Sequence, residues 1–236
     1  PDNDDVGNHS VVLKATDSAG AVVTQSFTVT VANTNDAPTI TSSAVTSVNE
    51  DAAYSYTFAS TDVDVGDSLT LAATTKPSWL SFNAATGVLS GTPDNDDVGN
   101  HSVVLTATDS SSVVTTQSFT LTVANVNDAP TITSSALAEA TQDAGYSYTF
   151  AASDIDLGDS LTLAATTKPS WLSFKAATGV LSGTPSNSDT GSHSIVLTAT
   201  DSASAVVTQS FTVTVSNTND APTITSSAVT SVNQNA

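Results

Sequence analysis

The side chains of this chain that could do chemistry are mainly aspartates, gathered in loops rich in Asp, Asn, Gly and Pro at 62–67, 93–100 and 125–130. Short carboxylates on tight loops present oxygen atoms at fixed positions, and Ca²⁺ takes about six to eight oxygen ligands. Aspartates also cap turns and keep surfaces soluble, which is the ordinary explanation for such clusters. The loops therefore predict either divalent cation sites or solubilising turns.

The elements that must position these loops recur along the chain. The run Asn-Asp-Ala-Pro-Thr-Ile begins at Asn35, Asn127 and Asn219, so the sequence repeats every 92 residues without gaps. A period of this length is that of a domain. It predicts the C-terminal part of one repeat at 1–36, complete repeats at 37–128 and 129–220, and the start of another at 221–236. We therefore expect a segment of a longer array.

Within one repeat the hydrophobic pattern indicates β-strands that bury one face. Apolar and polar residues alternate from Tyr54 to Phe58 and again from Val103 to Ala107. The pattern predicts an all-β fold, a tandem array of Greek-key sandwiches. Trp79 and Trp171 are expected in the cores rather than on a ligand platform. The seven expected strands of the first complete repeat are roughly 38–43, 53–59, 68–74, 79–83, 86–91, 101–108 and 113–124.

Composition excludes several classes of partner. The 23 Asp and Glu against 4 Lys and Arg give a formal net charge of −19. Nucleic acid and anionic membrane surfaces are bound through clustered Lys and Arg, so neither is expected as a partner. No apolar run approaches the length of a membrane span. The chain has no Cys, which excludes a disulfide scaffold and a zinc–thiolate site.

The sequence carries no pattern of an enzyme. His9, His101 and His193 share one position of the repeat, with no nucleophile motif near them, which favours a structural role. A glycosidase needs two carboxylates placed across a sugar-sized cleft. The aspartates here instead lie at domain ends and recur in every copy. We expect no enzymatic activity in this chain.

Several motifs together carry a family resemblance. They are Asp62-Val-Asp64 before Gly66, Thr75-Lys-Pro-Ser-Trp-Leu-Ser-Phe82, Thr86-Gly-Val-Leu-Ser-Gly-Thr-Pro93, Ala107-Thr-Asp109 and Val123-Ala-Asn-Val-Asn-Asp-Ala-Pro130. These residues resemble the dystroglycan-type cadherin-like domains of large bacterial surface proteins, which overlap with the putative-immunoglobulin repeats of the same proteins. The resemblance covers the whole chain and implies a cadherin-like or immunoglobulin-like sandwich.

The resemblance also implies calcium at the junctions between successive repeats. For the junction between the two complete repeats, the implied ligands are Glu50, Asp94, Asp96, Asn127, Asp128, Asp154, Asp156 and Asp201. For the preceding junction they are Asp2, Asp4, Asn35, Asp36, Asp62, Asp64 and Asp109. Without a cation these close carboxylates would repel one another. Bound calcium would therefore remove this repulsion and make the junction rigid.

The third junction departs from this pattern. Gln142, Ser186 and Ser188 occupy the positions of Glu50, Asp94 and Asp96. We expect this linker to bind calcium weakly and to bend more easily than the linker after Asp128. Four further aspartates lie beside the implied ligands but off the family pattern, and we expect them to be turn residues or supporting groups: Asp67, Asp97, Asp159 and Asp189.

These features favour a structural extender module of a bacterial cell-surface or secreted repetitive adhesin, located outside the cell and serving adhesion or biofilm formation. Its first partners would be neighbouring repeats of the same chain. One alternative is a carbohydrate- or protein-binding module of a secreted matrix or polysaccharide-degrading protein. Another is a self-assembling extracellular fibre. Sugar binding calls for an exposed aromatic strip, whereas alternation places Tyr54 and Tyr56 together on one inward face.

Overall fold

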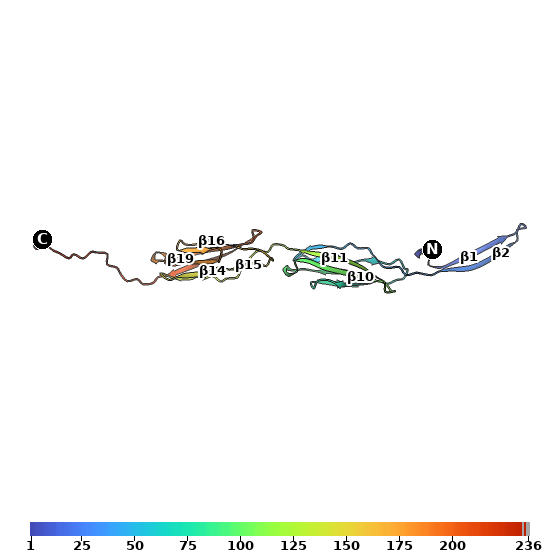
Figure 1. Cartoon of the computed structure of the whole chain (residues 1–236), viewed down its shortest axis with the longest axis horizontal. Helices are drawn as coiled ribbons and strands as arrows, with labels where there is room; N and C mark the ends of the chain where they lie inside the picture. Colours follow the sequence, from blue (N-terminus) through green and yellow to red (C-terminus); the bar gives the residue numbers. More distant parts are fainter. Residues whose placement is uncertain (233, 235–236) are drawn as a thin grey trace. The chain divides into compact units, whose positions relative to one another are not determined.

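The computed structural model describes residues 1–232 and 234, whose regular structure is almost entirely β-strand (Figure 1). The chain divides into two compact units, one ending at Val126 and the other beginning at Asn127. The first unit opens with the 3₁₀ helix η1 (Asn3–Asp5) and the hairpin β1 (Gly7–Thr16) and β2 (Val22–Val31). Among the described residues, no helix has the length and apolar character needed to cross a membrane.

A sandwich of nine strands makes up the rest of the first unit. Its strands are β3 (Thr39–Ile40), β4 (Ser47–Asn49), β5 (Tyr54–Thr57), β6 (Ser60–Thr61), β7 (Thr70–Thr75), β8 (Leu80–Asn83), β9 (Val88–Gly91), β10 (Gly99–Thr108) and β11 (Val114–Ala124), with helix η2 (Asn95–Asp97) before β10. The main sheet has the order β4-β11-β10-β7, and the second sheet has the order β5-β9-β8. Strand β4 joins β11 in parallel, whereas the other pairs are antiparallel.

The second unit follows the same plan. Its strands are β12 (Thr131–Ile132), β13 (Glu139–Thr141), β14 (Tyr146–Thr149), β15 (Ala152–Ser153), β16 (Thr162–Thr167), β17 (Leu172–Lys175), β18 (Val180–Gly183), β19 (Gly191–Thr200) and β20 (Val206–Ser216), with helix η3 (Asn187–Asp189) before β19. The main sheet has the order β13-β20-β19-β16, and the second has the order β14-β18-β17. Tandem all-β sandwiches are thus the fold that the sequence predicts.

The long hairpin β10–β11, green in Figure 1, shows why these residues form a sheet. Val103, Leu105 and Ala107 of β10 are buried, while the Ser and Thr residues that alternate with them along the strand lie on the other, more polar face. Successive side chains of a strand point to opposite faces, so this alternation turns one row of β10 into the core. The two strands pair in continuous register from Gly99 opposite Val123 onward.

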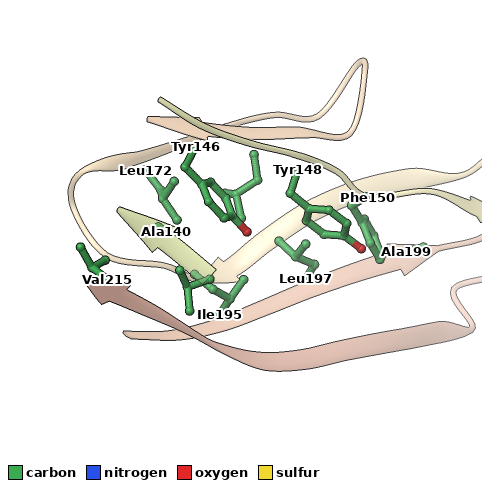
Figure 2. Close-up of a cluster of buried hydrophobic side chains, with 11 residues drawn as sticks. Ala140, Tyr146, Tyr148, Phe150, Leu172, Ile195, Leu197, Ala199 and Val215 are labelled. Atoms are coloured by element: carbon green, nitrogen blue, oxygen red, sulfur yellow. The ribbon is translucent and has the colours of Figure 1, made fainter. Parts of the chain in front are cut away.

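The core of each unit lies between its main sheet and its second sheet. In the second unit, Tyr146, Tyr148 and Phe150 face residues of β19 across the sandwich, as Figure 2 shows. The β19 residues of this cluster are Ile195, Leu197 and Ala199. The first unit repeats the cluster with Tyr54, Tyr56 and Phe58 against Val103, Leu105 and Ala107.

The buried tyrosines confirm the inward orientation that the alternation predicts. The Tyr54 hydroxyl donates to the Val45 carbonyl oxygen at 2.8 Å, and the Tyr56 hydroxyl donates to Gln117 Oε1 at 2.6 Å. Burial raises the pKa of Tyr54 to about 12. Trp79 packs edge-on against Tyr54 with ring centroids 6.1 Å apart. These rings therefore belong to the core and its border rather than to a sugar platform.

A tight turn after β8 brings two backbone segments into close contact at Gly87. This residue has φ of +70°, and a Cβ atom there would lie 2.2 Å from the Phe58 carbonyl oxygen. The Gly87 carbonyl oxygen accepts a hydrogen bond from the Phe58 N–H at 2.8 Å. Only glycine meets both requirements without strain.

The structure adds two short strands that the hydrophobic pattern does not reveal. Strand β4 has three residues and β6 has two, which is too short for a period of two to show. Leu80 is fully buried, whereas Trp79, which was expected in the core, is only partly buried and packs with Phe82 against the edge of the core. Their apolar surfaces still close the sandwich on that side.

Candidate metal centre

The linker that leads from the N-terminal hairpin into the first sandwich is held by aspartates of that sandwich. The Asn35 side-chain amide donates to Asp109 Oδ2 at 2.8 Å, and the Asp36 N–H donates to Asp64 Oδ2 at 2.8 Å. The Asn3 amide donates to Asp36 Oδ2 at 2.9 Å. Linker, loops and N-terminal segment thus share one polar network, and four of the predicted ligands meet in it.

Asp109 is fixed by the end of β10 and the turn that follows. Its Oδ1 accepts a hydrogen bond from the Val113 N–H at 2.7 Å, and the side chain is buried. The Asn35 amide, helped by backbone N–H groups of the turn, holds the pKa of Asp109 below its ordinary value. Asp109 therefore remains a carboxylate, the form that ligates a cation.

The loop between β6 and β7 gathers three aspartates. Asp62, Asp64 and Asp67 each place a carboxylate oxygen within 4.8 Å of the other two. Asp64 is only 7% exposed, and its Oδ1 is shielded from solvent without a hydrogen-bond donor among the described residues. A buried charged oxygen without a partner is costly. This set of carboxylate oxygens fits a hard divalent cation such as Ca²⁺.

The second unit repeats the arrangement around its own linker. The Asn127 amide donates to Asp201 Oδ2 at 2.8 Å, and the Asp128 N–H donates to Asp156 Oδ2 at 2.9 Å. Asp154, Asp156 and Asp159 form the corresponding loop cluster, with oxygens within 4.8 Å of one another. The predicted residues of this unit therefore come together as those of the first unit do.

Glu50 lies at the opposite end of the first sandwich, directly after β4. It is 2% exposed, and its Oε1 accepts a hydrogen bond from the Val126 N–H. Its Oε2 is shielded from solvent and has no donor among the described residues. A buried acid with one unsatisfied oxygen has the character of a cation ligand rather than of a surface group.

Four other predicted ligands serve as helix caps or flank them. Asp94 caps η2 by accepting the Asp96 N–H at 3.0 Å, and Asp2 caps η1 by accepting the Asp4 N–H at 3.1 Å. All four side chains are exposed. Within the part of the chain that the structure describes, none of the three-aspartate loops includes them. Their role as calcium ligands stays a prediction.

Gln142 makes a contact that Glu50 cannot make. Its side-chain amide nitrogen donates to Asp220 Oδ2 at 2.9 Å, and its Oε1 accepts from the Thr218 N–H at 3.2 Å. In the second unit, a side-chain amide therefore donates a hydrogen bond to a carboxylate of the linker. Weak calcium binding by this linker remains a prediction. The hydrogen bond adds a contact between Gln142 and the linker that the number of predicted calcium ligands does not reveal.

The histidines have structural contacts. His101 Nε2 lies 2.6 Å from the Asp97 carbonyl oxygen, and the ring packs edge-on against Trp79 with centroids 6.2 Å apart. His193 repeats both contacts with Asp189 and Trp171. These contacts link the η2 and η3 turns to the aromatic border of each core.

The cap of η3 leads to a pH prediction. The Ser186 hydroxyl donates to Asp189 Oδ2 at 2.6 Å and, together with the Ser186 N–H and the charge of His193, holds the pKa of Asp189 below its ordinary value of 3.8. A lowered pKa stabilises the fold above pH 3.8, and the stabilisation is lost as the pH falls through the folded pKa. Ser186→Ala should raise the pKa of Asp189, measured by NMR titration of its carboxyl carbon. Ser173→Ala, which removes a serine hydroxyl bonded to the Ser182 carbonyl, should leave it unchanged.

Comparison with known proteins places these sandwiches in a family. The putative Ig domain family matches residues 37–124 and again residues 129–216. The chain is 32% identical over 135 residues to the serine-rich adhesin for platelets of Staphylococcus aureus strain USA300, a match that covers 57% of this chain and 6% of the adhesin. For strain MRSA252 the identity is 30% over 135 residues, covering 57% of this chain and 10% of the adhesin. The chain thus spans only a small part of these relatives.

Solved structures of cadherin domains share the fold. PcdhgB3 EC1-4 superposes with a TM-score of 0.62 at 18% identity, covering 93% of this chain and 59% of that chain. Protocadherin Gamma B2 extracellular cadherin domains 1-5 superpose with a TM-score of 0.56 at 22% identity, covering 91% and 47%. Identity this low supports the fold alone. By these two matches, which together cover most of its residues, the chain belongs to the putative Ig domain family.

Proposed function

We propose that this chain is a structural extender segment of a bacterial cell-surface or secreted adhesin, in which calcium at the repeat linkers stiffens the array for cell adhesion or biofilm formation. The observation that carries the proposal is the linker Asn35–Asp36, hydrogen-bonded to Asp109 and Asp64 beside solvent-shielded carboxylate oxygens that have no donor among the residues that the structure describes. Tandem putative Ig domains and the partial similarity to a staphylococcal surface adhesin support the extracellular setting.

The residues of the first unit that would hold calcium are those that already surround its linker. Asp62, Asp64 and Asp109 offer carboxylates from two loops, and Asn35 and Asp36 offer side-chain oxygens from the linker. Bound calcium would supply the positive charge that these acids lack. The hydrogen bonds from Asn35 and the Asp36 N–H orient the acids beforehand, so little ordering is left to accompany binding.

The 92-residue period extends the proposal to the second unit. There the corresponding ligands are Asn127, Asp128, Asp154, Asp156 and Asp201. On sequence grounds we also include the capping aspartates Asp2, Asp4, Asp94 and Asp96 and the buried acid Glu50. The proposed partners are neighbouring repeats of the same array.

The test is thermal unfolding of the full chain with calcium and with chelator, alongside small-angle scattering of the same samples. At calcium 100-fold above Kd, binding adds about 2.7 kcal/mol, which raises the melting temperature of a domain of this size by about 10 °C or more. We also expect a longer and stiffer particle. Asp109→Asn/Asp201→Asn should reduce both effects, because each Asn keeps the shape but not the charge.

No change in either measurement would mean that the aspartates are solubilising turns. A carbohydrate- or protein-binding role would then come first, tested on a glycan array with the same chain. The burial of Tyr54, Tyr56, Tyr146 and Tyr148 removes these rings as sugar platforms and so gives that alternative no support.

A further inference from the structure

Each carboxylate of the loop 62–67 has one oxygen that accepts a hydrogen bond and one that has no donor. The Asp64 N–H donates to Asp62 Oδ1 at 3.0 Å, the Asp36 N–H donates to Asp64 Oδ2 at 2.8 Å, and the Ser110 hydroxyl donates to Asp67 Oδ1. The other oxygens are Asp62 Oδ2, Asp64 Oδ1 and Asp67 Oδ2. All three are shielded from solvent and find no donor among the described residues.

The second unit repeats this pattern atom for atom. Within the described part of the chain, the oxygens without donors are Asp154 Oδ2, Asp156 Oδ1 and Asp159 Oδ2, while the Ser202 hydroxyl donates to Asp159 Oδ1. Asp156 is 8% exposed. The loop sequences differ between the units, Asp-Val-Asp-Val-Gly-Asp in one and Asp-Ile-Asp-Leu-Gly-Asp in the other. The same three unsatisfied oxygens therefore arise on two different loops.

Three like-charged oxygens withheld from water and from donors destabilise the loop unless a cation joins them. Their spacing is suitable for one. Ca²⁺ lies about 2.3 to 2.6 Å from each oxygen ligand, so ligands around one ion are separated by about 5 Å or less. The oxygens offered by Asp62, Asp64 and Asp67 lie within 4.8 Å of one another.

We propose that Asp62, Asp64 and Asp67, with their copies Asp154, Asp156 and Asp159, form a divalent-cation site contained within each sandwich. Asp67 and Asp159 are its additional ligands. The site shares two acids with the proposed linker calcium and so rests on the proposed function, but it needs no ligand from the preceding repeat.

Asp64 connects this site to the linker. Its Oδ2 accepts the linker N–H of Asp36, while its Oδ1 belongs to the set without donors. One carboxylate thus serves the linker on one side and the cation on the other. Gly66, with φ of +91°, forms a turn that brings Asp67 back toward Asp64. The Asp67 N–H donates to the Asp64 carbonyl oxygen at 3.2 Å.

The test compares the full chain with the double variant Asp67→Asn/Asp159→Asn. The Asn carbonyl oxygen can still accept from the serine hydroxyl, while its amide nitrogen replaces the oxygen without a donor. Bound calcium is measured by equilibrium dialysis, and thermal unfolding is measured with calcium and with chelator. The matched control is Asp97→Asn/Asp189→Asn, which removes the same charge from the capping turns.

We expect the double variant to lose one bound ion per loop and to melt at a higher temperature than the wild type in chelator, because the repulsion among the acids is relieved. The control should retain all ions. The single variants Asp67→Asn and Asp159→Asn should each lose one ion, which provides the same test if the double variant folds poorly. Unchanged calcium binding in these variants overturns the inference and leaves the linker calcium intact. A wild-type chain that binds no calcium overturns both.

Discussion

Replacing Gly87 by Ala is expected to destabilise the first sandwich by about 2 to 5 kcal/mol. The new Cβ would lie 2.2 Å from the Phe58 carbonyl oxygen, at a residue with φ of +70°. A left-handed backbone costs a residue with a side chain about 1 to 2 kcal/mol, and moving the turn away from Phe58 adds about 1 to 3 kcal/mol. The 2.8 Å hydrogen bond from the Phe58 N–H to Gly87 would also lengthen.

Gly66→Ala is the matched control for this change. Gly66 has φ of +91°, but a Cβ there would meet no atom within 4 Å, so only the backbone cost of about 1 to 2 kcal/mol remains. Urea unfolding in chelator, read from Trp79 fluorescence in a Trp171→Phe background, gives both values for the first unit. Equal losses at the two glycines would show that the contact with Phe58 relaxes freely.

Phe150→Ala is expected to cost the second sandwich about 3 to 5 kcal/mol, because it removes a fully buried aromatic ring and leaves a cavity in the core. Phe150 is 1% exposed and packs with Tyr148 and Leu197 in the cluster of Figure 2. Domains are stable by only about 5 to 15 kcal/mol, so at the lower end of that range this one change removes more than half of the total free energy of unfolding.

The control for Phe150→Ala is Leu157→Ala in the same unit. Leu157 is 95% exposed, and surface changes of this kind usually stay within about 0.5 kcal/mol. Both variants are followed by urea unfolding through Trp171 fluorescence in a Trp79→Phe background, with chelator present. A loss below about 1 kcal/mol for Phe150→Ala would mean that the neighbouring side chains collapse into the space.

Much of the fold could be predicted because long strands with one buried face leave a clear period of two. Strands β10 and β11 alternate over ten and eleven residues, so their existence and their inward face follow from the sequence. Strands β4 and β6 could not be predicted. Strand β4 forms by pairing with β11 at the edge of the main sheet, and β6 forms by pairing with β3. Both pairings join segments distant in the sequence and are properties of the tertiary structure.

The candidate site was predicted in part, for a related reason. Asp62, Asp64 and Asp109 stand in motifs of fixed spacing, so the resemblance identified them, and the structure brings Asp64 and Asp109 to the linker. Asp67 lies off that pattern, which predicts only a turn residue or a supporting group. Its position in the cluster depends on the Gly66 turn and on Ser110, which is 43 residues away in the sequence.

The capping aspartates show where residue type alone is ambiguous. An Asp before a short helix is both a good N-cap and a good calcium ligand, and the structure shows the cap at Asp94 and Asp2. Gln142 shows the converse. Its replacement of an acid predicts weaker calcium binding, but its hydrogen bond to Asp220 joins residues 78 apart, a proximity that no local pattern encodes.

The parallel pairing of β4 with β11 has a mechanical consequence for each sandwich. In the first sandwich β4 follows only the short strand β3, and β11 is the last strand. Hydrogen bonds from the Thr122 N–H to the Thr46 carbonyl oxygen and from the Glu50 N–H to the Ala124 carbonyl oxygen join these two segments. In the second sandwich, β13 and β20 are joined in the same way. Tension applied between the two ends of such a pair pulls its hydrogen bonds in shear, so they must break together rather than one by one. Each sandwich is thus built to resist stretching along the direction of the chain.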